Sequence, residues 1–211
     1  MGIPKDIFET MPPKRYDEVR GEIRNGDIAL FAGTEGGSRV IEIFTHSLFC
    51  HVGFVWRMDD IDRIMLLESV ENAGVRMLPL SAKVNGGQSG KPYDGKLVIA
   101  RHADFPKPGK AFDAAFGKMT QFAVDRLGCP YNAEEIIMIG ATIAAGLAGI
   151  AMPAALKPMH AYICSEYADA CYRELGVTIT SEKPNFVAPA DFANEPRVTA
   201  VATIVPDDAG R

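Results

Sequence analysis

The order of strand-like and helix-like segments constrains the fold of this chain more than any other feature. Short apolar segments rich in strand formers occupy the first half, and amphipathic helical patterns begin only after Pro106 and Pro108. The strand candidates are residues 28–31, 46–56, 64–70, 75–80 and 96–101, with 198–205 as a last one. Strands that precede helices in this way predict an α+β fold.

The turns between strand candidates predict how the strands pair. Residues 58–62 and the Asn72–Gly74 turn are short enough to join antiparallel neighbours, so residues 46–80 are expected to form a meander. We therefore expect an antiparallel sheet, or a small barrel, packed against helices.

Two later segments have the spacing of amphipathic helices. Residues 111–127 place aromatic and aliphatic side chains at three- and four-residue steps. The second helix is expected from about Cys164 to Leu175, followed by Gly176 in the left-handed conformation that closes many helices.

The length of 211 residues suits one domain with a proper core. We expect a single domain over residues 1–211, with its core at about 26–175. Residues 1–25 are polar and contain prolines, which predicts an N-terminal extension on the surface. Residues 176–211 are expected to form a tail that wraps the surface.

Composition narrows the classes of function. The net charge of -5 argues against a general nucleic-acid binder, which needs a basic face. Four unevenly spaced cysteines without a CxxC pair favour reduced thiols over a disulfide scaffold or a zinc finger. The N-terminal residues lack the apolar segment of a secretory signal, so a cytoplasmic location is favoured.

The segment Ile136–Leu156 is 21 residues long and contains no charge. Its length meets the criterion for a membrane span, but it is nearly half Ala and Gly, contains Pro153 and lacks flanking arginines. We expect a buried or partly exposed helix, with peripheral membrane contact or a homodimer interface as alternatives.

Cys164 is expected at the amino end of its helix, where a thiol becomes reactive. The partial positive charge of the helix end stabilises a thiolate and lowers the thiol pKa. Ser165 and Glu166 would lie in the first turn, where free amide protons favour oxygen and negative charge. The alternative is a small buried hydrophobic residue, the role expected for Cys171 two turns further along.

A thiolate nucleophile also needs a base and a group that orients the base. His51 lies on one strand candidate, and Glu68 is the only ionisable residue of the next. If the hairpin loop centres near Asp60, the two lie almost opposite, within cross-strand reach. Singly, such residues are more often structural, but together with Cys164 they favour catalysis. His160 is the rival base, without an evident carboxylate to orient it.

Four short motifs, in this order, resemble the circularly permuted papain-like hydrolases of the NlpC type, the YiiX-like group. They are His51-Val-Gly-Phe-Val55, Leu66-Leu-Glu68, Gly128-Cys-Pro-Tyr-Asn132 and Tyr162-Ile-Cys-Ser-Glu166. The resemblance spans about residues 26–175. It implies a permuted papain-like domain in which the helix that carries the nucleophile follows the sheet, with the catalytic order His, carboxylate, Cys.

The resemblance also implies roles for single residues. Cys164 would be the nucleophile, His51 the general base and Glu68 the group that orients the imidazole. Tyr131, Ser165 and Tyr162 are predicted to bind the substrate, and amides near Ser165 would stabilise the oxyanion. The implied substrate is an amide or acyl group, such as a cell-wall peptide or a lipid-linked group, and neither a metal nor another cofactor is expected.

Three alternatives stay open at this point. The first is a lipid-binding or membrane-docking module that uses Ile136–Leu156 and carries a vestigial triad. The second is an acyltransferase on the same scaffold, in which the acyl group passes to an amine or alcohol. The third is a zinc site made by His51, Glu68 and Cys164, which a papain-like thiol site does not need.

Overall fold

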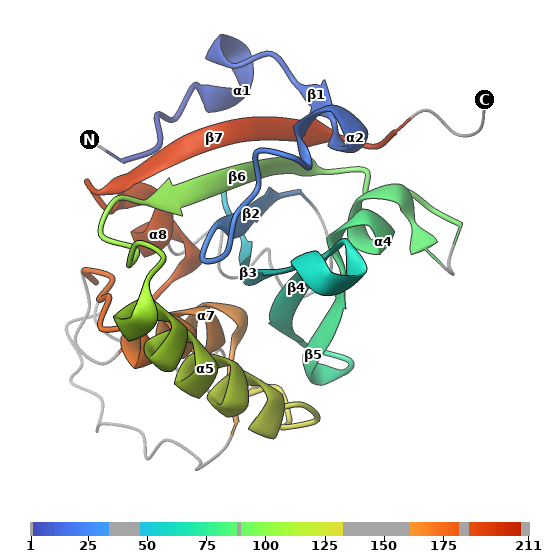
Figure 1. Cartoon of the computed structure of the whole chain (residues 1–211). Helices are drawn as coiled ribbons and strands as arrows, with labels where there is room; N and C mark the ends of the chain where they lie inside the picture. Colours follow the sequence, from blue (N-terminus) through green and yellow to red (C-terminus); the bar gives the residue numbers. More distant parts are fainter. Residues whose placement is uncertain (1, 34–46, 88–89, 133–160, 182–185, 208–211) are drawn as a thin grey trace, which may run out of the picture.

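The computed structural model describes residues 2–33, 47–87, 90–132, 161–181 and 186–207. These residues form a seven-stranded sheet that packs against helices (Figure 1). The strands are β1 (Lys14–Arg15), β2 (Ile28–Ala32), β3 (His51–Met58), β4 (Arg63–Val70), β5 (Gly74–Pro79), β6 (Lys96–His102) and β7 (Val198–Val205). The helices are α1 (Ile7–Thr10), α2 (Tyr16–Val19), α4 (Leu80–Asn85), α5 (Lys110–Asp125), α7 (Cys164–Glu174) and α8 (Pro189–Asn194). The predicted α+β class is confirmed.

The strands follow the order β1-β7-β6-β2-β3-β4-β5 across the sheet. All neighbours are antiparallel except β1 and β7, which are parallel. Strands β3, β4 and β5 form the predicted meander. Strand β7 lies between β1 and β6, so this part of the expected surface tail belongs to the sheet itself.

Each face of the sheet carries its own apolar core, because successive strand residues point to opposite faces. On β3, Val52 and Phe54 join the core under α5, α7 and α8, whereas Val55 joins the core under α2 and α4. Figure 1 shows α5 and α7 side by side below the sheet and α4 beside β4. The two sets of helices therefore cover opposite faces.

The N-terminal residues contribute to both cores instead of lying on the surface. Ile3 and Ile7 are buried in the core beside α7, and Tyr16, Val19 and Ile23 are buried in the other. The charged residues between them point outward, which gave this segment its polar appearance. Residues 2–25 are therefore an integral part of the described fold.

Both predicted helices are present as α5 and α7. Met119 and Ala123 are the buried residues of α5. Helix α7 begins at Cys164 and ends at Glu174, two residues before Gly176, whose φ of 74° is left-handed as expected. The buried hydroxyl of Tyr172 on α7 donates to the Gly26 carbonyl at 2.6 Å, which ties α7 to the turn before β2.

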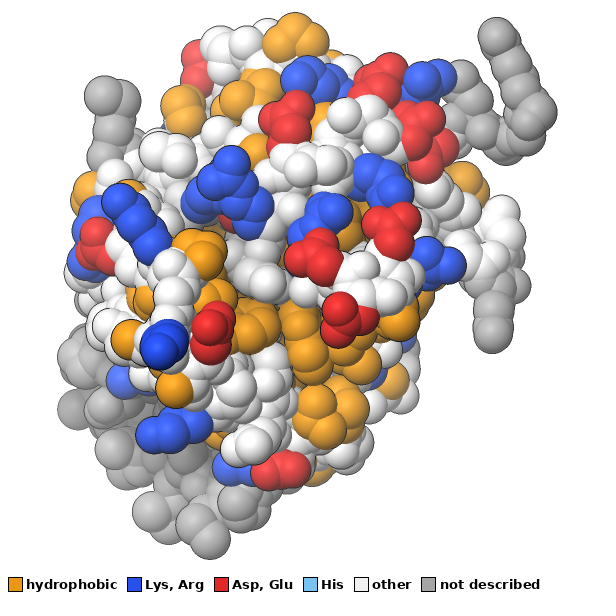
Figure 2. Space-filling view, viewed as in Figure 1, with side chains coloured by type: hydrophobic (Ala, Val, Ile, Leu, Met, Phe, Trp, Pro, Cys, Tyr) orange, Lys and Arg blue, Asp and Glu red, His pale blue; other side chains and the backbone are white. Residues whose placement is uncertain are grey.

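Ile136–Leu156 lies outside the described residues. Among the helices that the structure describes, none combines the length and apolar character needed to cross a bilayer. Figure 2 shows acidic and basic side chains interspersed over the viewed face.

Candidate active site

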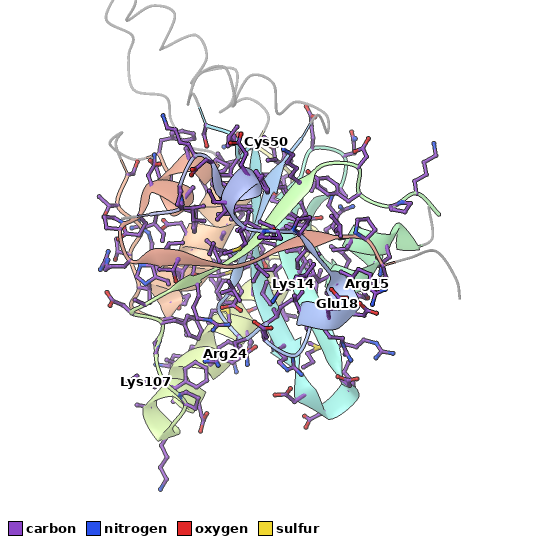
Figure 3. All side chains as sticks on the ribbon, turned by 90° about the horizontal axis from the view of Figure 1, so that it is seen from above. Lys14, Arg15, Glu18, Arg24, Cys50 and Lys107 are labelled. Carbon is purple, nitrogen blue, oxygen red and sulfur yellow. The ribbon has the colours of Figure 1, made fainter. Side chains whose placement is uncertain are left out.

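His51 begins β3, and the pairing of β3 with β4 stops short of it. The last paired residues are Phe54 and Leu67, although β3 continues to pair with β2 as far as His51. Figure 3 labels Cys50, the neighbour of His51, at the opposite end of the sheet from Arg24 and Lys107. The amino end of α7 approaches at this unpaired end, where the Ser69 hydroxyl donates to the Tyr162 carbonyl at 2.7 Å.

His51 and Glu68 meet diagonally across the two strands. Continuing the β3–β4 register would place Glu68 opposite Gly53, two residues from His51, so the expected near-opposite pairing is offset. The side chains still bridge the offset, because diagonal neighbours lie within reach of long side chains. His51 Nε2 and Glu68 Oε2 are 2.6 Å apart. Nε2 is thereby committed to the carboxylate, and Nδ1 is the ring nitrogen left for another partner.

Gly53 allows the two strands to approach closely. A Cβ at this position would stand 2.5 Å from Leu66 Cδ1 and 3.1 Å from the Leu67 carbonyl oxygen. The room left by the missing side chain is therefore filled by the neighbouring strand.

Glu68 is fully buried and is held by cations as well as by His51. Arg76 pairs directly with Glu68 across β4 and β5, and its Nε and NH2 groups donate to Glu68 Oε1 at 2.8 and 2.5 Å. Burial alone would raise the pKa of Glu68, but the hydrogen bond and charge of His51, with the charges of Lys83 and Arg76, lower that pKa to about 2. The carboxylate is therefore ionised at neutral pH.

Cys164 is buried at the start of α7, and three polar groups of the described residues stabilise the charged form of its sulfur. One is the His51 imidazole, which interacts with the sulfur by charge and by a hydrogen bond. The others are the backbone amides of Val52 and Ser165, one from β3 beyond the β4 pairing and one from the first turn of α7. All three favour the thiolate over the thiol.

These contacts shift the two titrations in opposite directions. Burial would raise the pKa of Cys164, but the charge and hydrogen bond of His51, with the two amides, lower it. Burial would lower the pKa of His51, but the Cys164 sulfur and then Glu68 raise it to about 10. The arrangement therefore favours a thiolate–imidazolium pair at neutral pH.

The three predicted substrate-binding residues occupy different surroundings. Tyr131 forms an isolated bridge with Tyr162, and burial, together with the Cys164 charge, raises its pKa. The Tyr162 hydroxyl accepts at 3.1 Å from Nε of Arg126, the residue that follows α5, so this hydroxyl is engaged in a hydrogen bond. The Ser165 hydroxyl is buried without a hydrogen-bond partner among the described residues, and only its amide reaches Cys164.

The remaining cysteines and histidines have other environments. Cys171 is buried on α7, and burial raises its pKa. Cys50 donates to the carbonyls of Phe31 and Gly33. His102, at the far end of β6, packs its ring against Tyr172 at 6.0 Å. The rival base His160 lies outside the described residues.

Two parts of the site are absent from the sequence-based prediction. Arg76 follows the hydrophobic–polar alternation of an ordinary strand, and only its position opposite Glu68 gives it a partner. The Val52 amide can interact with the Cys164 sulfur because β3 extends past Phe54, its last residue paired with β4. A register worked out from the Asn72–Gly74 turn could have found Arg76, whereas the end of a strand pairing leaves no pattern in the sequence.

Fold and site together define an α+β protein in which Cys, His and Glu side chains meet at the start of α7, beside the end of the β3–β4 pairing. A crystal structure of the metalloprotein YiiX from Escherichia coli O157:H7 (DUF1105) is similar, with a TM-score of 0.57, 19% identity, and coverage of 87% of this chain and 98% of that chain. This chain therefore has a YiiX-like fold. No protein-family model and no curated protein sequence matches it.

Proposed function

We propose that this protein is a cysteine hydrolase with a permuted papain-like arrangement, in which Cys164 is the nucleophile. The proposal rests above all on the continuous chain of contacts from Cys164 through His51 to Glu68. A thiol paired with an imidazole that is itself oriented by a carboxylate is the arrangement that activates cysteine for acyl transfer. The order of these residues along the chain agrees with the permuted hydrolases that the sequence resembles.

The proposed reaction has two stages. The Cys164 thiolate attacks the carbonyl carbon, a C–S bond forms, and the electron pair of the carbonyl moves to oxygen. His51 then donates its proton to the leaving amine or alcohol, and the C–N or C–O bond breaks. In the second stage His51 takes a proton from water, the water oxygen attacks the acyl-enzyme, and the thiolate leaves. The Ser165 and Val52 amides, both beside the sulfur, are the donors proposed for the oxyanion.

The proposed substrate is an amide or acyl group, in a cell-wall peptide or a lipid-linked compound. Transfer of the acyl group to an amine or alcohol instead of water uses the same residues, and product analysis distinguishes the two outcomes. Membrane docking through Ile136–Leu156 stays a prediction, because those residues lie outside the described part of the chain.

The similar YiiX structure is described as a metalloprotein, so the donor set here must be tested against a metal. Glu68 Oε2 and His51 Nε2 form a hydrogen bond with each other, and Glu68 Oε1 accepts hydrogen bonds from Arg76. Within the described ranges, no group of three His, Cys, Asp or Glu side chains is arranged to hold an ion. These residues do not fit a metal with three protein ligands, and no step of the proposed reaction passes through one.

The test is the order in which the four thiols react with iodoacetamide at neutral pH, followed by peptide mass mapping. Cys164 should be alkylated first, because a thiolate reacts and a thiol does not. Cys164→Ala should remove the fast phase, and His51→Ala should slow it. Equal labelling of Cys164 and Cys129, which is half-buried, would contradict the proposal.

A further inference from the structure

We infer that Arg76 is a positioning residue of the proposed cysteine site, because it holds one oxygen of Glu68 and thereby directs the other oxygen at His51. This inference rests on the proposed function, but it concerns a residue outside the Cys164–His51–Glu68 chain. Arg76 lies on β5, an edge strand of the described sheet, and its side chain is 39% exposed.

The geometry divides the two carboxylate oxygens between two partners. Arg76 Nε and NH2 both donate to Oε1, whereas Oε2 lies 2.6 Å from His51 Nε2. The guanidinium is a rigid planar fork, so two bonds to one oxygen restrict rotation of the carboxylate about its last torsion. The oxygen that faces His51 is thereby fixed in place before any substrate binds.

The charge of Arg76 also matters, because Glu68 has no exposed surface. A buried carboxylate tends to take up a proton unless cations and hydrogen bonds stabilise its charge. Among the described residues, the charged groups that act on Glu68 are His51 from β3, Lys83 from α4 and Arg76 from β5, and the Cys164 sulfur on α7 interacts with the same imidazole. Among these, Arg76 combines direct pairing across the sheet with two hydrogen bonds, of 2.8 and 2.5 Å, to the carboxylate.

If Glu68 is less firmly held or less fully ionised, the imidazolium of His51 loses stabilisation. The thiolate of Cys164 is then less favoured, and its formation moves to higher pH. Arg76 would therefore act on the sulfur through two other side chains without touching it.

The experiment measures the rate of Cys164 alkylation by iodoacetamide between acid and alkaline pH, with the full-length protein and no substrate. Arg76→Gln should raise the acid-side inflection of this profile by about one pH unit. Arg76→Lys retains the charge but not the fork, so its inflection should rise by less. Arg63→Gln makes the same change on β4 and is the matched control. Arg63 donates to the Ile61 and Asp62 carbonyls and not to Glu68, so this variant should keep the wild-type profile.

The outcomes are distinct. Wild-type profiles in both Arg76 variants, with near-ultraviolet circular dichroism showing that they are folded, would overturn the inference and leave the proposed function standing. An equal shift in Arg63→Gln would also overturn it. If Arg76→Gln does not fold, Arg76→Lys decides alone, and an unchanged inflection overturns the inference. A wild-type inflection near pH 8.5, about the value of an ordinary thiol, would count against the proposed function itself.

Discussion

Replacing Glu68 with Gln removes one buried charge and leaves the size of the side chain almost unchanged. The surroundings hold the pKa of Glu68 at about 2, below its ordinary value of 4.5. By linkage this difference corresponds to about 3 kcal/mol of folding free energy at neutral pH. Because the folded-state pKa is the lower one, this stability is present above about pH 4.5 and is lost as the pH falls toward 2.

We therefore expect Glu68→Gln to lower the free energy of unfolding by about 3 kcal/mol at pH 7 and by about half of that at pH 3. Urea unfolding at both pH values, followed by fluorescence, measures the difference. Glu71→Gln makes the same chemical change at an exposed position and should change stability by less than about 0.5 kcal/mol. An equal loss at pH 7 and pH 3 would refute the reasoning, because it would trace the effect to packing and not to ionisation.

Three further substitutions test the packing and hydrogen bonding of the fold. Gly53→Ala should lower the free energy of unfolding in urea by about 1–3 kcal/mol, because its Cβ would stand 2.5 Å from Leu66 Cδ1. Gly117→Ala on α5 should instead be neutral or stabilising, because a Cβ added at Gly117 would have no neighbouring heavy atom within 4 Å. A change of the same sign in both variants would contradict this account. Tyr172→Phe should cost about 1–2 kcal/mol in thermal unfolding, because the Gly26 carbonyl loses a buried hydrogen bond, and an unchanged melting temperature would show that this bond is replaced.

The sequence predicted the parts of the fold that depend on local patterns. The β3–β4 hairpin and α7 carry clear periodicities, and Gly176 follows the end of α7, so these elements were recognised, although β3 begins at His51 and not at residue 46 as expected. The short β3–β4 turn also explains why His51 and Glu68 could be brought together from sequence. Their diagonal offset depends on the exact register, which the turn region did not specify.

The parts that could not be predicted depend on long-range contacts. Ile3 and Ile7 are isolated apolar residues among charged ones, and their burial follows from the docking of the N-terminal segment beside α8, where the Ile3 amide donates to the Ala193 carbonyl at 2.7 Å. Strand β7 was recognised as a strand, but its place between β1 and β6 depends on partners far away in sequence. The partner of Arg76 likewise becomes evident only with the β4–β5 register.

The ionisation of Cys164 by His51 is the central claim, and thiolate absorbance at 240 nm tests it most directly. The measurement is a pH titration of the wild-type protein from which the titration of Cys164→Ala is subtracted. We expect a difference of about one thiolate per chain that persists down to at least about pH 6, because the imidazolium and two amides stabilise the sulfur. A difference signal that develops only near pH 8.5, the range of an ordinary thiol, would contradict the account.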